Sequence, residues 1–114
     1  MNHQKLKCYE VLINIAKKMP AITANLPSGE GYIIDQLKRA LSSAILNLSE
    51  GNGRLSLKEK RRFFDISLAS ISESSSAIDI LRAYNLISIQ LYNEIQSSIR
   101  LAYAMTIGLK KSIL

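Results

Sequence analysis

The sequence predicts an all-α protein, an antiparallel up-down-up-down four-helix bundle that forms a single domain over residues 1–114. Three observations predict it. Apolar residues recur at steps of three and four along four stretches, no stretch shows the alternation of a β-strand, and the connections are short. The chain has 114 residues, of which 47% are hydrophobic. That is enough for one buried core and too little for two domains.

The first predicted helix covers residues 5–19. Its apolar face consists of Cys8, Leu12, Ile15, Ala16 and Met19. We expect Pro20 to end it, because proline lacks the backbone donor that a helix interior needs. Residues 21–31 are rich in Asn, Pro, Ser and Gly and predict a connecting loop.

The second predicted helix follows this loop and ends near residues 49–53. Its apolar face consists of Ile34, Leu37, Leu41, Ala44 and Leu48. We expect Gly51 to adopt the left-handed conformation that commonly ends a helix, since glycine carries no Cβ to oppose it.

The third predicted helix opens with a capping box. Ser56 can accept the amide of Glu59, while the Glu59 side chain reaches back to the Ser56 amide. A buried stripe then continues through Phe64, Leu68, Ile71, Ile78 and Leu81. The helix is expected to stop near Tyr84 and Asn85.

The fourth predicted helix begins around Ser88 and ends in Lys110 and Lys111, whose charges suit the negative end of a helix. Its buried positions are Leu91, Ile95, Ala102, Met105 and Leu109.

Six of the eleven residues from Ser67 to Ala77 are serine. We interpret Ser67, Ser70 and Ser74, with Ala77, as a stripe of small residues that lets another helix approach closely. That helix would belong either to the same chain or to a neighbouring subunit. The alternative is that these serines are simply solvent-exposed.

The antiparallel topology places the start of the first helix, the turn between the second and third, and the end of the fourth at the same end of the bundle. The cations on these segments are Lys5, Lys7, Arg54, Lys58, Lys60, Arg61, Arg62, Lys110 and Lys111. The acids expected nearby are Glu10, Glu50 and Glu59. The formal net charge is +6.

Such a cluster of cations is typical of a phosphate-backbone contact surface. The alternative is a solvated helix start, although Arg61 and Arg62 oppose the helix dipole there and local stability does not favour them. Tyr9, Phe63 and Phe64 could stack on unpaired bases if they are exposed, or else belong to the core.

The sequence has few candidates for catalytic residues, and they form no recognisable constellation. His3 is expected in a mobile tail, and Cys8 lies on an apolar face as a buried structural thiol. No Glu is followed three residues later by His, as di-metal bundles require, and Gly51–Arg54 lacks the remainder of a phosphate loop. We therefore expect no enzymatic activity, no metal and no cofactor. One cysteine, short apolar runs and no signal-peptide pattern predict a cytoplasmic protein without a membrane partner.

A family resemblance rests on a motif around the turn between the second and third helices. The matching residues are Gln36 to Ala40, Ser43, Asn47, Glu50, Gly51, Gly53, Arg54, Lys58, Arg62 to Phe64, Ile66, Ala69, Ser70 and Glu73. Over about residues 5–110 the chain resembles the four-helix-bundle proteins encoded in intervening sequences of bacterial 23S ribosomal RNA genes. It departs from them at Ala44-Ile45, where the family usually has Ile-Pro, which predicts a straighter second helix here.

That family is similar in fold to the accessory variability determinants of diversity-generating retroelements, which form a pentameric barrel with a basic surface. The resemblance therefore implies a non-enzymatic homo-oligomer, with five subunits by analogy, that associates with RNA or another nucleic acid. A reverse transcriptase is a further candidate partner implied in the same way.

The motif residues Arg39, Ser43, Asn47, Glu50, Gly51 and Gly53 have a structural interpretation of their own. Asn47 and Glu50 could hold the turn by accepting backbone amides between Gly51 and Arg54, and Glu50 could pair with Arg39 or Arg54. A rigid turn would present the neighbouring cations in fixed geometry. The sequence thus predicts an RNA-associated bundle, and the alternative function is a protein-interaction scaffold with no nucleic-acid ligand.

Overall fold

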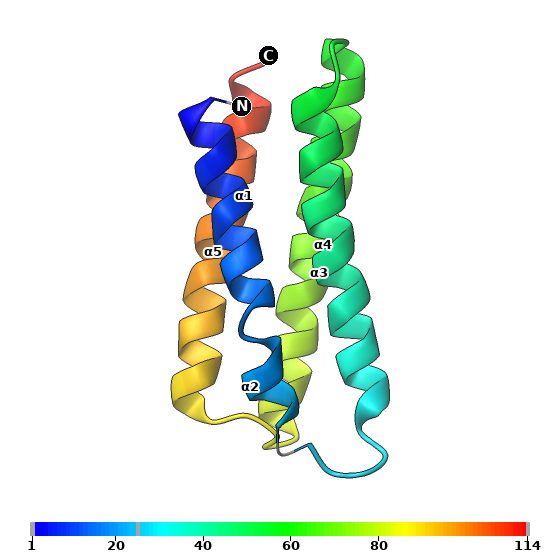
Figure 1. The fold of residues 1–114 in the computed structure, drawn as a ribbon, viewed down its shortest axis with the longest axis vertical. Coiled ribbons are helices and arrows are strands. Elements are labelled where there is room, and N and C mark those ends of the chain that lie inside the picture. The colour runs from blue at the N-terminus through cyan, green and yellow to red at the C-terminus, as the bar shows by residue number, and fades with distance from the viewer. Residues whose placement is uncertain (1, 25, 114) are drawn as a thin grey trace.

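The computed structural model describes residues 2–24 and 26–113 and confirms the predicted all-α four-helix bundle (Figure 1). Its helices are α1 (His3–Ala16), α2 (Met19–Thr23), α3 (Gly31–Gly53), α4 (Leu57–Ala83) and α5 (Ile89–Lys111). The long helices α1, α3, α4 and α5 run along the molecule. The two chain ends and the α3–α4 turn lie at one end of the bundle, and α2 and the α4–α5 turn lie at the other.

Each long helix packs on two others around one core: α3 on α1 and α4, and α5 on α1 and α4. All the apolar positions predicted for α3 and α4 are buried. On the other two helices the prediction was less accurate, because Ala16, Leu91 and Met105 are only partly buried. Over the described ranges, none of the helices has the length and apolar character needed to cross a membrane.

The predicted first helix and loop need correction. α1 ends at Ala16, and Met19–Thr23 forms the separate short helix α2, so Pro20 begins a helix instead of ending one. Proline fits there because the first helical residues have no backbone donor to lose. Ile22, predicted in the loop, is buried in the core. His3 was expected in a mobile tail but is the first residue of α1.

The stripe of small residues on α4 packs against α3 of the same chain. The Ser67 hydroxyl donates to the carbonyl oxygen of Ala44 at 2.7 Å, and the Ser43 and Ser70 hydroxyl oxygens are also 2.7 Å apart. Ser67 and Ser74 are fully buried. Small side chains thus bring two long helices close together, and hydrogen bonds satisfy their hydroxyls. Solvent exposure of the stripe, the alternative, is wrong.

The prediction that Gly51 ends the second helix is wrong. Gly51 lies within α3, which continues to Gly53. A Cβ on Gly51 would sit 2.7 Å from two atoms of the Phe64 ring. Glycine is needed at this position because α3 and α4 approach each other closely, and not because the backbone is left-handed. The predicted α4 stop is confirmed: Tyr84 caps the helix and Asn85 has a φ of 59°.

The capping box is half confirmed. The Ser56 hydroxyl accepts the Glu59 amide at 3.3 Å, but the Glu59 carboxylate lies 3.9 Å from the Arg54 guanidinium. Within the described residues, no hydrogen bond returns from Glu59 to the Ser56 amide. Ser88 caps α5 as predicted, accepting the Leu91 amide at 3.0 Å.

Candidate nucleic-acid interface

The topology brings three distant segments together: the first turns of α1, the α3–α4 turn with the start of α4, and the last turn of α5 (Figure 1). Nine of the fifteen cations lie on them. We call this surface the basic end, defined by Lys5, Lys7, Arg54, Lys58, Lys60, Arg61, Arg62, Lys110 and Lys111.

Two of these cations are paired with acids. Arg54 lies 2.9 Å from Glu50 and 3.9 Å from Glu59, and Lys110 lies 2.6 Å from Asp65. Asp65 was overlooked in the sequence, because only the packing of α5 beside α4 brings it to Lys110. The basic end is therefore less positive than the nine cations alone suggest.

Lys60 has a structural role that the sequence did not reveal. Its ammonium donates to the carbonyl oxygens of Gly51 at 3.0 Å and Asn52 at 3.2 Å, which belong to the last turn of α3. Desolvation, followed by repulsion from Lys5, lowers the pKa of Lys60. Lys60 thus joins the end of α3 to the start of α4, and we do not count it among the cations open to a ligand.

Asn47 and Glu50 were predicted to hold the α3–α4 turn by accepting its backbone amides, but their side chains have other partners. Asn47 donates back to the Ser43 carbonyl at 2.8 Å and to its hydroxyl at 3.2 Å. Glu50 pairs with Arg54, one of the two partners considered, and not with Arg39. Two motif residues on α3 contact α4, Ser43 at Ser70 and Gly51 at Phe64, while Lys60 holds the turn. Arg39 is exposed.

The three aromatic candidates for base stacking divide between core and surface. Phe64 is 1% exposed and belongs to the core. Tyr9 is partly buried and packs against the core. Phe63 is half-buried, with the guanidinium carbons of Arg54 and Arg62 at 5.0 and 5.1 Å from its ring centroid. Both distances suit cation–π attraction, which restrains the two arginines.

Apart from Lys60, six cations of the basic end make no ion pair within residues 2–24 and 26–113: Lys5, Lys7, Lys58, Arg61, Arg62 and Lys111. Beside them a hollow of about 330 Å³ is lined by Lys5 of α1 and by Ser49, Asn52 and Gly53 of α3. The side-chain amide of Asn52 is buried without a hydrogen-bond partner in the described structure. This surface therefore carries several positive charges without acidic partners, a distribution that suits a polyanion.

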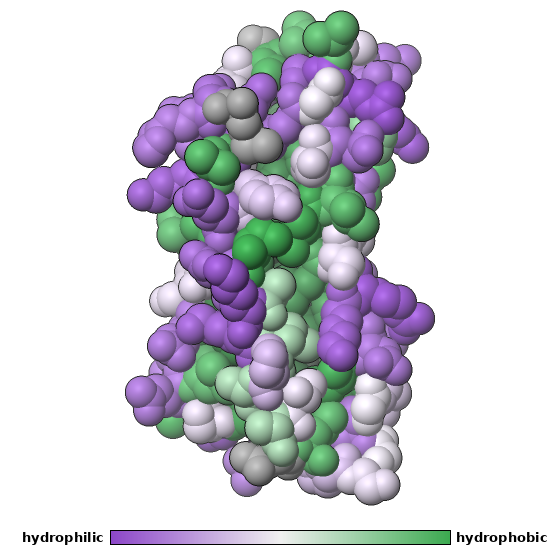
Figure 2. All heavy atoms as spheres, viewed as in Figure 1, coloured by the Kyte–Doolittle hydropathy of each residue, from purple (hydrophilic) through white to green (hydrophobic). Residues whose placement is uncertain are grey.

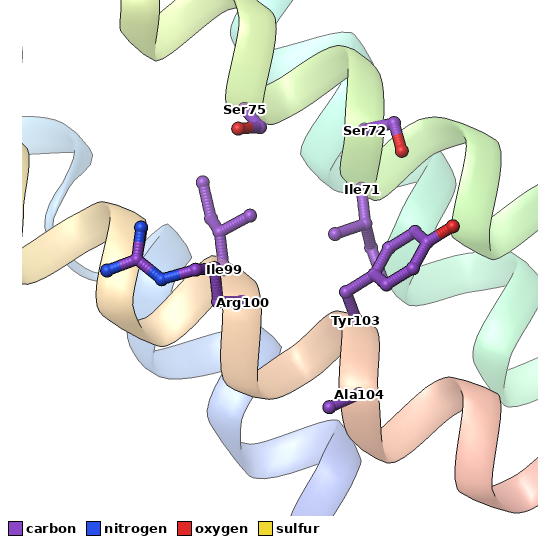
Figure 3. A pocket seen from close by; sticks show the side chains of 7 residues that line it. All are labelled: Ile71, Ser72, Ser75, Ile99, Arg100, Tyr103 and Ala104. Atoms are coloured by element: carbon purple, nitrogen blue, oxygen red, sulfur yellow. The ribbon is translucent and has the colours of Figure 1, made fainter.

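A second hollow, of about 290 Å³, lies between α4 and α5 away from the basic end (Figure 3). Ile71 and Ile99 contribute apolar surface, and Ser72 and Ser75 on α4 face Arg100 and Tyr103 on α5. No sequence pattern predicts this groove between α4 and α5, because it depends on how the two helices are spaced. Nearby, Gln96 donates to the Ser75 carbonyl and to Asp79, both at 3.0 Å.

Cys8 is a buried thiol, as predicted. It is fully buried, its sulfur lies 3.4 Å from the Thr106 hydroxyl oxygen, and burial raises its pKa. A raised pKa keeps the thiol protonated and unreactive at neutral pH. Over the described part of the chain, no group of three or more His, Cys, Asp or Glu side chains could hold a metal ion.

Comparison with known proteins adds one finding. The family model described as 23S rRNA-intervening sequence protein matches residues 4–108, which include every helix residue that defines the bundle core except the last of α5. No curated protein matches the chain.

Proposed function

The chain belongs to the 23S rRNA-intervening sequence protein family, and from that premise we propose that it binds RNA through its basic end, as a homo-oligomer and without catalysis. One observation carries the proposal. Three segments far apart in the sequence meet at this end, and six of their cations, Lys60 apart, have no acidic partner among the described residues.

The chemistry of the basic end suits a phosphate backbone. Each Lys or Arg that neutralises a phosphate releases condensed counterions, which gives a salt-dependent gain in affinity. Arg61 and Arg62 lie in the first turns of α4, where cations oppose the helix dipole. Helix stability does not explain them, whereas an anionic ligand does.

Self-association would strengthen such binding. A ring of bundles, five by resemblance to the pentameric relatives, would place several basic ends on one RNA and convert weak contacts into avidity. A ribosomal RNA, or an RNA carried with a reverse transcriptase, is the ligand we propose for such a ring. Phosphate contacts alone carry no base information, so they do not define a sequence preference.

The test is fluorescence anisotropy of a labelled structured RNA at several salt concentrations, with the protein mass measured by light scattering on the same sample. We expect affinity to fall with salt, with a slope of about 0.7–0.9 per phosphate contact. Arg61→Ala with Arg62→Ala should reduce both affinity and slope, with unchanged helicity. The matched control is Lys17→Ala with Lys38→Ala, two exposed cations outside the basic end, which should change little.

The scaffold alternative has one observation in its favour, the partly apolar groove between α4 and α5. If folded, oligomeric protein fails to bind RNA even at low salt, the RNA proposal is wrong. A stoichiometric protein partner recovered after nuclease treatment would then support the scaffold function.

A further inference from the structure

Leu55 is the most exposed large apolar side chain among the described residues, at 96%. It lies between Arg54 and the α4 cap Ser56, at the α3–α4 turn, which is one of the three segments of the basic end. Figure 2 shows hydrophobic spheres at this tip of the molecule, with hydrophilic spheres beside them. An apolar side chain held in water among cations calls for a physical explanation.

Helix capping does not provide that explanation. A hydrophobic residue just before an N-cap commonly packs against the fourth residue of the helix. For α4 the N-cap is Ser56, so the fourth residue is Lys60. The Lys60 ammonium turns instead to the carbonyls of Gly51 and Asn52. Leu55 therefore lacks its usual local partner.

The other tight turn of the bundle shows that this exposure is not general. Ile87 occupies the same position before the α5 cap Ser88 and is 6% exposed. The next residues in the two helices, Leu57 and Ile89, are alike, at 53% and 54%. The two turns thus differ in the apolar residue before the N-cap. Leu55, at the basic end, points outward, whereas Ile87 is buried.

The α3–α4 turn is also held in place. The Arg54 amide donates to the Glu50 carbonyl at 3.1 Å, and its guanidinium pairs with Glu50 at 2.9 Å. Ser56 caps α4, and Lys60 joins the two helices. Leu55 is thus presented on a fixed support, so that a ligand need not order the turn on binding.

We propose that Leu55 packs against the face of an unpaired base, so that the RNA bound at the basic end is one with unpaired nucleotides. Apolar side chains, leucine among them, insert against base faces where a stack is opened. Loops and bulges have such faces already exposed, whereas a uniform duplex must first be unstacked. Lys58, which makes no ion pair among the described residues, would neutralise a flanking phosphate. This inference rests on the proposed function and adds the class of RNA.

The experiment compares two RNAs of equal length and charge, a hairpin with a loop of unpaired nucleotides and a fully paired blunt duplex, by anisotropy at fixed salt. The variant is Leu55→Ser, and the matched control is Leu46→Ser, which removes a 64% exposed leucine from the middle of α3. We expect Leu55→Ser to weaken hairpin binding about tenfold, the worth of one buried leucine. Duplex binding and the salt slope should change less than about twofold, since phosphate contacts remain.

The outcomes separate this inference from the proposed function. If Leu55→Ser binds the hairpin like the wild type while Arg61→Ala with Arg62→Ala weakens binding, Leu55 has no base contact and only this inference is wrong. Equal weakening with hairpin and duplex also overturns it. A third outcome is that Leu55→Ser keeps its RNA affinity but no longer binds a protein partner that the wild type retains after nuclease treatment. The leucine then belongs to a protein interface, and this inference is wrong. Circular dichroism of each variant verifies that the fold is intact.

Discussion

The two tight turns of the bundle have the same capping arrangement, but the apolar residue before the N-cap is buried in one turn and exposed in the other. Each ends in a serine N-cap, Ser56 or Ser88, that accepts an amide three residues on. Each has a branched apolar residue before that cap. Ile87 is 6% exposed at the α4–α5 turn, whereas Leu55 is 96% exposed at the α3–α4 turn.

The difference comes from the partner that each helix offers. In α5 the fourth residue is the half-buried aromatic Tyr92, and the Arg82 guanidinium holds the turn through the Ile87 carbonyl at 2.9 Å. In α4 the fourth residue is Lys60, which is engaged with the end of α3. The α4–α5 turn thus buries its apolar residue and gains stability from it. The α3–α4 turn exposes both its charged side chains and its leucine to solvent.

The largest effect is expected at the buried residue of the pair. Ile87→Ser should lower the free energy of unfolding by about 2–4 kcal/mol, because it removes buried apolar surface and leaves a hydroxyl in its place. Leu55→Ser should change it by less than about 0.5 kcal/mol, since an exposed side chain gains little on folding. Urea denaturation of both variants measures the contrast, and equal losses would show that the two turns are alike.

An intermediate effect is expected in the helix that leads into the α3–α4 turn. Gly51→Ala should destabilise the protein by about 1–3 kcal/mol, because its Cβ would meet the Phe64 ring at 2.7 Å. Gly53→Ala is the control, since a Cβ there meets nothing within 4 Å. Thermal unfolding should rank Gly51→Ala below the wild type and Gly53→Ala at or slightly above it. The reverse order would contradict the close α3–α4 contact.

The smallest effect concerns Tyr92, whose hydroxyl donates to Asp79 at 2.6 Å. This hydrogen bond, followed by burial, raises the pKa of Tyr92 above its ordinary 10.0. A group with a raised pKa contributes stability below its unfolded pKa and loses that contribution as the pH rises through the folded value. The wild type should therefore be more stable than Tyr92→Phe at about pH 8, and the difference should shrink above about pH 10.

Urea midpoints of the two proteins across this pH range check the prediction. Tyr103→Phe is the control, because the Tyr103 hydroxyl has no hydrogen-bond partner among residues 2–24 and 26–113. A difference between wild type and Tyr92→Phe that stays constant with pH would contradict it.

Much of the fold followed from the sequence, since helix periodicity is local. The apolar steps through Leu37, Leu41 and Leu48 placed α3, and Ser56 and Ser88 placed the starts of α4 and α5. Pro20 was misjudged because proline can either end a helix or begin one, and the burial of Ile22 in the core decides in favour of α2. Gly51 was misjudged because glycine also serves close packing, which involves Phe64 thirteen residues further along the chain.

The candidate site divides in the same way. The bundle and the gathering of cations at one end are predictable from the sequence, because helix lengths and short turns fix which segments meet. Tertiary packing sets which cations remain without an acid, since Asp65 reaches Lys110, and Lys60 reaches Gly51, through contacts between helices. It alone also decided that Leu55 faces solvent while Ile87 faces the core, because exposure depends on what packs around a side chain and not on its place before a cap.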